Sequence, residues 1–339
     1  MATSDSNRFS EGSPRTSQIF GILGKLHLLF FAVLALFPRL LLAQWNATIG
    51  AQSDDLGRQA LAFLPNEIWI HAGESITWTM AANEAHTVTF LTNGQIRPPF
   101  TVECQGFSAP SASFDGSACV TSGLLFQGDK FTVVFPVAGN FKLVCLVHSD
   151  MTGTIHVLDP SESLPHDQAF YDGEAQRESA DLLRAETTGV MNHHHHLENA
   201  VIAGHGDTVA TGGGSDSLSV MRFSDPEITV HAGDTIEWTN DDPTAAHTIT
   251  FGPEPQDLVG PSSNVTVDAD GARHGVLNSP SDAVHSGFIE AAPQDRTGLA
   301  QAPSGVTRFR VTFSKPGIYP YICALHDVLG MKGSVVVLP

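Results

Sequence analysis

Positive charge is scarce in this sequence. Its 339 residues include 17 lysines and arginines against 36 aspartates and glutamates, which gives a formal net charge of -19 at pH 7. Other polyanions repel such a chain at long range, so nucleic acid and anionic membrane surfaces are poor partners for it. We expect no nucleic-acid partner, and a cationic or locally basic protein fits the charge better.

Long apolar segments are scarce as well. The run Leu28 to Phe37 is apolar throughout, with Lys25 before it and Arg39 after it. A run of this length is too short to span a membrane and matches the core of a secretory signal peptide. We therefore predict a signal peptide over residues 1–43, a periplasmic or secreted location, and no membrane span in the mature chain. An uncleaved anchor is the alternative, which Arg39 and the short run disfavour.

Cysteine is limited to four residues, which do not form one disulfide framework. Cys104 and Cys119 flank a loop rich in serine, glycine and proline, and in a chain that leaves the reducing cytosol we predict a disulfide between them. Closing a loop of this size contributes roughly 3 kcal/mol to the free energy of unfolding on a chain-entropy estimate. Cys145 and Cys323 lie instead in apolar, strand-like runs, each with a histidine three residues later. These two cysteines are candidate metal ligands.

The chain contains one long pattern twice. Residues 65–90, PNEIWIHAGESITWTMAANEAHTVTF, are matched by residues 225–251, DPEITVHAGDTIEWTNDDPTAAHTITF, and residues 131–158 are matched in the same order by residues 309–338. Within each copy β-branched and aromatic residues alternate with polar ones between Gly- and Pro-containing turns, which is typical of an antiparallel β-sandwich. The repeat therefore has the size of a whole domain.

We predict an all-β protein with two tandem Greek-key β-sandwiches, over residues 44–158 and 200–339. Residues 159–199 form the linker, and within it the segment from Pro165 to Glu186 is rich in helix-forming residues without an internal proline, which predicts a helix. Two further signals are a short helix indicated at 295–302, and the run His193 to His196, which is compositional evidence for adventitious metal binding or copper loading.

Both copies carry the same four residue types in the same order. They are His86, Cys145, His148 and Met151 in the first copy, and His247, Cys323, His326 and Met331 in the second. Two imidazoles, a thiolate and a weak axial thioether form the ligand set of type 1 copper, because they suit Cu(I) and still hold Cu(II). A buried cysteine, histidine or methionine alone is more often a packing residue. The repeated conjunction favours copper over zinc or plain core, and we predict two type 1 coppers per chain.

Both copies resemble the cupredoxin family over most of their length. The Cys145-x2-His148-x2-Met151 loop has amicyanin-like spacing, and Cys323-x2-His326-x4-Met331 has plastocyanin-like spacing. The resemblance implies that the histidines and the cysteine of each set are the strong ligands and the methionine is axial. It also implies that His148 and His326 reach the surface through an apolar patch and form the route for electrons.

These features predict an exported protein that carries single electrons between redox partner proteins and is not an enzyme; its oligomeric state stays open. The main alternative is a two-domain multicopper oxidase or a copper nitrite reductase. Those enzymes place a histidine beside the copper-binding cysteine, whereas Val144 and Leu146 flank Cys145, and Cys323 has equally apolar neighbours. A third possibility is an exported copper carrier or buffer, although a complete ligand cage favours retention of the metal over its release.

Overall fold

The structure is a computed structural model that describes residues 43–185, 199–291 and 306–339. Three predicted features lie outside these residues: the signal peptide up to residue 42, the four-histidine run and the short helix at 295–302. Among the described residues, no helix combines the length and the apolar character needed to cross a membrane.

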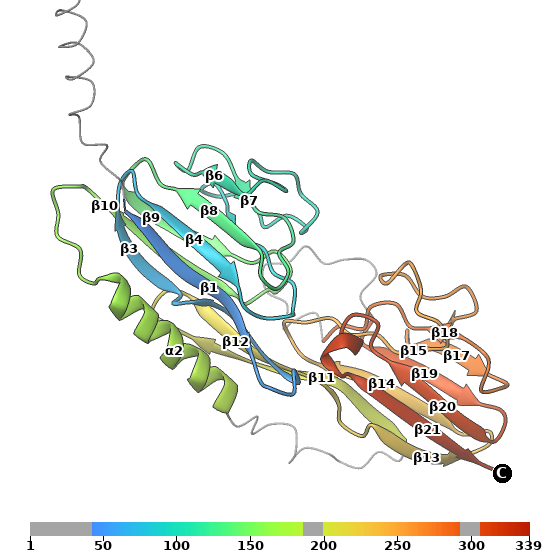
Figure 1. Ribbon diagram of the computed structural model, residues 1–339. Helices are drawn as coiled ribbons and strands as arrows, with labels where there is room; N and C mark the ends of the chain where they lie inside the picture. Colours follow the sequence, from blue (N-terminus) through green and yellow to red (C-terminus); the bar gives the residue numbers. More distant parts are fainter. Residues whose placement is uncertain (1–42, 186–198, 292–305) are drawn as a thin grey trace, which may run out of the picture. The chain divides into compact units, whose positions relative to one another are not determined.

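The first sandwich pairs its strands in two layers (Figure 1). Its strands are β1 (Gln44–Gln52), β2 (Arg58–Leu64), β3 (Glu67–His71), β4 (Ser75–Met80), β5 (Thr89–Phe90), β6 (Ser111–Ser113), β7 (Val120–Thr121), β8 (Lys130–Val134), β9 (Gly139–Val144) and β10 (Thr152–Leu158). One layer has the order β2, β1, β4, β8, β6, and the other has the order β3, β10, β9, β5, β7. The predicted all-β fold of this copy is confirmed.

Alternating side chains explain why these strands close over a core. In β4, Ile76, Trp78 and Met80 are buried, and in the neighbouring β8 Phe131 and Val133 are buried. Successive residues of a strand point to opposite faces, so this spacing places one side of each strand inside the sandwich. Burying a large apolar side chain contributes roughly 1.5–3 kcal/mol, and aromatic residues from both layers fill this space.

The second sandwich repeats this plan. Its elements are β11 (Ala200–Ala210), β12 (Ser215–Phe223), β13 (Glu227–His231), β14 (Thr235–Asp241), β15 (Thr250–Phe251), β16 (Thr266–Val267), β17 (Arg273–Leu277), β18 (Val284–His285), β19 (Arg308–Phe313), β20 (Gly317–Ile322), the 3-10 turn η2 (Asp327–Leu329) and β21 (Lys332–Leu338). Its layers have the orders β12, β11, β14, β19, β17, β16 and β13, β21, β20, β15, β18. Trp238 takes the place that Trp78 has in the first core.

The predicted helix is present as α2 (Gln168–Arg184). The Asp167 side chain caps it by accepting a hydrogen bond from the Phe170 N–H, a contribution of about 1 kcal/mol. Leu182 packs on the alanines of β2, and the Tyr171 hydroxyl bonds the main chain of Trp69. The helix therefore covers the outer face of the first sandwich, where Figure 1 shows it alongside β1 and β12.

The two sandwiches are connected by a strand pair that the sequence does not reveal. Strand β12 of the second sandwich lies antiparallel to β2 of the first, with Ser217 opposite Leu61 and Val220 opposite Arg58. Beside this pair, the Asn66 Nδ2 atom donates to Asp216 Oδ2 at 3.0 Å. Because β2 and β12 would otherwise be edge strands, their pairing satisfies main-chain groups on both.

Candidate metal centres

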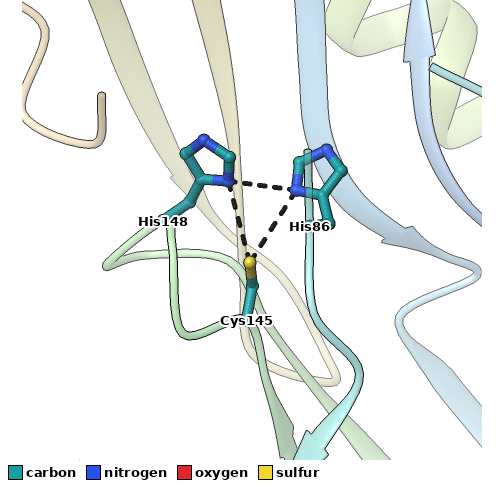
Figure 2. Close-up of side chains that lie close together, drawn as sticks. All are labelled: His86, Cys145 and His148. Atoms are coloured by element: carbon teal, nitrogen blue, oxygen red, sulfur yellow. Dashed lines mark hydrogen bonds between the residues drawn. The ribbon is translucent and has the colours of Figure 1, made fainter. Parts of the chain in front are cut away.

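In the first sandwich, three predicted ligands meet at one end of the layers. Cys145 follows β9 directly, His148 lies in the next loop, and His86 is held from a distant segment by a main-chain bridge to Leu125. The Cys145 sulfur is 3.8 Å from His86 Nδ1 and 3.7 Å from His148 Nδ1, and the two nitrogens are 3.0 Å apart. Figure 2 shows both rings turning these nitrogens toward the sulfur. Met151, directly before β10, is buried in the same core.

The surroundings of Cys145 favour a thiolate. The Thr87 N–H points at the sulfur at 3.4 Å, and the Thr87 hydroxyl accepts from the Leu146 N–H at 2.8 Å, which fixes the chain on both sides. Burial alone would raise the pKa of the Cys145 thiol, but hydrogen bonds from His148 and His86 hold that pKa well below its ordinary value. A deprotonated sulfur is the form that binds a metal.

The second sandwich builds an equivalent centre. The Cys323 sulfur is 3.9 Å from His247 Nδ1 and 3.4 Å from His326 Nδ1, and the nitrogens are 3.1 Å apart. The Thr248 N–H faces the sulfur at 3.3 Å, as its counterpart does in the first centre. The longer spacing between His326 and Met331 is taken up by η2, which ends at Gly330 in the left-handed conformation. Burial opposes ionisation of Cys323, yet charge and hydrogen bonds from the histidines hold its pKa well below the usual value.

The chemistry of these donors fits copper. Within each set the three candidate ligand atoms lie within 4.8 Å of one another, and these are the two groups of this kind among the described residues. All the predicted ligands, both methionines included, are buried. One soft sulfur and two imidazoles converging in a dry core are suited to a metal that changes between two oxidation states.

A glycine in each sandwich makes room for the upstream histidine. Gly50 in β1 and Gly204 in β11 both have positive φ, at 67° and 74°, at places where the strand pairing is irregular. A side chain at Gly204 would overlap the His247 ring, and one at Gly50 would crowd the His86 ring. The bulged strand therefore packs its main chain directly on the histidine.

The two centres differ beyond that glycine. In the second centre, Asp242 Oδ2 lies 3.8 Å from His247 Nε2, and the other oxygen of this fully buried carboxylate accepts from the Thr244 and Ala245 N–H groups. Neither His86 Nε2 nor His247 Nε2 has a hydrogen-bond partner, but an ion pair with a carboxylate is present only at His247 among the described residues. A carboxylate thus faces the upstream histidine in one centre and not in the other.

Glu84 contacts both centres at once. Its Oε1 atom is 3.4 Å from His148 Nε2, and its Oε2 atom is 3.4 Å from His326 Nε2. Burial alone would raise the pKa of the Glu84 carboxyl, but the charges of His326 and His148 and their hydrogen bonds hold it well below the ordinary value. Burial alone would lower the pKa of His148, but its hydrogen bonds with Cys145 and Glu84 and the charges of these two groups raise that pKa to about 9.

The expectation that the loop histidines reach the surface is wrong for this chain. His148 is 1% exposed and His326 is 3% exposed. The outer edge of each ring faces Glu84 instead of solvent. The surface route for electrons that the family resemblance implied at these two residues is therefore not open.

The remaining cysteine prediction is confirmed. Cys104, between β5 and β6, and Cys119, directly before β7, form a disulfide, while Cys145 and Cys323 are free and buried. The sequence analysis missed Glu84, Asp242 and the two glycines. One signal was present for Glu84: it lies two residues before His86, where the second repeat has Ala245 before His247.

Comparison with known proteins finds that one family model matches both halves of the chain. The family model of copper-binding proteins of the plastocyanin/azurin family matches residues 51–158 and 207–338. None of the curated proteins matches the chain.

Similar solved structures include an oxidised plastocyanin from Dryopteris crassirhizoma, at 21% identity and a TM-score of 0.22, covering 41% of this chain and 99% of that one. A purple cupredoxin from Nitrosopumilus maritimus has 21% identity and a TM-score of 0.22, covering 42% of this chain and all of the other. A reduced amicyanin variant has 16% identity and a TM-score of 0.24, covering 34% and 83%.

Proposed function

Because the chain belongs to the plastocyanin/azurin family of copper-binding proteins, with one matching region in each half, we propose that it is an exported electron-transfer protein with a type 1 copper in each of its two domains. The domains are residues 44–158 and 200–339. The ligands are His86, Cys145, His148 and Met151 in the first centre, and His247, Cys323, His326 and Met331 in the second. The two His/Cys/His sites with a methionine nearby agree with the prediction of two type 1 copper sites.

The observation that carries this proposal is the convergence of a thiolate and two imidazoles in each buried core. A bound copper would supply the one-electron change between Cu(I) and Cu(II). The protein holds the donors rigidly: main-chain and hydroxyl groups of Thr87 and Thr248 fix the two cysteine loops, and the surrounding core excludes water. Fixed ligands keep the rearrangement that accompanies each electron small.

The same features support a carrier over an oxidase or a nitrite reductase. Catalysis by copper needs a position where the substrate can bind the metal. In each centre the proposed ligand set is buried. The residues after Cys145 and Cys323 are Leu146 and Ala324, whose side chains cannot bind a second metal and so cannot connect the centre to one. Export is supported by the Cys104–Cys119 disulfide, because disulfides persist in oxidising compartments, and by the apolar run that begins at Leu28.

Copper loading of the full mature chain tests the proposal. We expect two copper ions per chain, an intense thiolate-to-copper band, and the narrow copper hyperfine splitting of type 1 sites in the EPR spectrum. Cys145→Ser and Cys323→Ser should each remove about half of the band, since each domain supplies its own thiolate. The loaded protein should exchange electrons with small mediators without sustained consumption of oxygen or nitrite. Steady turnover of either substrate would identify an enzyme, and rapid loss of copper to a chelator would favour a copper carrier.

A further inference from the structure

Glu84 lies between the two centres and belongs to the first domain alone. It is in the loop between β4 and β5, two residues before His86, and it is 8% exposed. Each of its carboxylate oxygens contacts a different loop histidine, His148 of its own domain and His326 of the second domain, both at Nε2 and both at 3.4 Å. One side chain therefore touches a proposed ligand of each copper.

We propose that Glu84 is a positioning residue shared by both centres: its carboxylate accepts one hydrogen bond from the Nε2–H of each loop histidine and so joins the two copper sites into one unit. The proposal rests on the proposed function, because it assigns a role to Glu84 through the copper ligands. It goes beyond that function, since two independent electron carriers on one chain would need no shared group.

The protonation of the imidazoles supports this role. In each loop histidine Nδ1 faces the cysteine sulfur, at 3.7 Å for His148 and 3.4 Å for His326. A nitrogen that binds a metal carries no proton, so the proton of a neutral ring is on Nε2. A carboxylate oxygen can accept a hydrogen bond, and Glu84 places one oxygen at each of these two N–H groups, both at 3.4 Å. It thereby selects the tautomer that presents Nδ1 to the metal.

The difference between the repeats supports the sharing. At the position of Glu84 the second domain has Ala245, which has no polar side chain. The second domain thus lacks a carboxylate of its own at this position, and the first domain supplies one to both rings.

Removing Glu84 should therefore weaken copper binding at both centres. The outer partner of a metal-binding histidine typically contributes about 10–100-fold to metal affinity. Each centre can be measured alone in the full chain, the first in Cys323→Ser protein and the second in Cys145→Ser protein. We expect Glu84→Ala to lower copper affinity at least about tenfold in both backgrounds, measured by competition with a copper chelator while the thiolate-to-copper band is recorded.

Asp216→Asn is the matched control. Asp216 is a buried carboxyl group that also connects the domains, through Asn66, and does not contact the copper-site histidines. It should leave both affinities unchanged. Glu84→Gln keeps the size of the side chain if the alanine variant does not fold, and its amide can accept from one ring only, so it should weaken one centre and spare the other.

A second measurement separates positioning from a general loss of structure. In Cu(I)-loaded wild-type protein, ¹⁵N-edited NMR should show two histidine Nε2–H signals that exchange slowly with water, one from His148 and one from His326. Both should exchange fast in Glu84→Ala and stay slow in Asp216→Asn. If Glu84→Ala changes the affinity or the N–H exchange of one centre alone, the shared role is wrong while the proposed function stands. If wild-type protein forms no thiolate-to-copper band, the proposed function itself fails.

Discussion

At the scale of single residues, the two copper sites differ most around the upstream histidines. The buried carboxylate of Asp242 lies 3.8 Å from the Nε2 atom of His247, whereas no such ion pair is present at His86 Nε2 in the described part of the chain. Burial alone would raise the pKa of the Asp242 carboxyl, but the hydrogen bond and charge of His247 hold it below its usual value. A negative charge beside the imidazole of a copper ligand would stabilise the more positive, oxidised metal.

We therefore expect the second centre to have the lower reduction potential. Asp242→Asn should raise the potential of that centre and leave the first unchanged, as measured by redox titration of Cys145→Ser protein and Cys323→Ser protein. The neighbouring Asp241→Asn is the control, since Asp241 is exposed and pairs with His205. An unchanged potential in Asp242→Asn, or an equal rise in Asp241→Asn, would contradict this assignment.

Residue identity alone predicted the two His/Cys/His clusters that the structure brings together, because type 1 copper needs specific side chains at short spacing after a strand. It could not predict Glu84, because a glutamate two residues before a histidine has no meaning until the fold brings His326 to it. The burial of His148 and His326 was missed for the same reason. Contacts between domains depend on how two surfaces meet, and a family resemblance within each domain carries no information on that.

At the scale of elements, helix α2 and strands β2 and β12 enclose two acidic groups. Burial and the charge of Glu178 together raise the pKa of Asp216 in β12 to about 8, and burial raises the pKa of Glu178 in α2 to about 7.

The alternation along each strand predicted the sandwiches, and the composition of the linker predicted the helix. The β2–β12 pair uses main-chain groups, which no side-chain pattern encodes.

These acids predict a stability that falls with rising pH. Unfolded carboxyl groups lose their protons near pH 4, and the folded ones lose theirs near pH 7 and 8, so between these values the folded state binds more protons. The free energy of unfolding should therefore decrease from about pH 5 to about pH 8. Asp216→Asn should remove much of that decrease, measured by urea unfolding at a series of pH values. Asp181→Asn, a change at an exposed residue of helix α2, should not. A decrease of equal size in wild type and Asp216→Asn would exclude Asp216 as its source.

At the scale of the whole molecule, the two domains are connected at the strand pair and again at Glu84. The family resemblance assigned His148 and His326 to electron exchange with partner proteins. In this chain both rings contact the Glu84 carboxylate instead. This arrangement favours exchange between the two centres over direct contact of either histidine with an external partner. Partner proteins would then approach the centres by other surfaces, and the net charge of -19 favours basic ones.

Internal exchange predicts a specific kinetic behaviour, on the premise that both coppers are bound. A short pulse of reductant can supply less than one electron per chain. The electron should then pass from one centre to the other, without any proton transfer, until the share of reduced copper at each centre matches the two reduction potentials. Because the step occurs within a chain, its rate should be the same over a tenfold range of protein concentration, followed by stopped-flow or pulse-radiolysis absorbance. Glu84→Ala should slow it, since the His148–Glu84–His326 contact is the short connection between the ligand sets, and Asp216→Asn should not. A rate proportional to protein concentration would mean that electrons move between chains, and the two centres would then act as separate carriers.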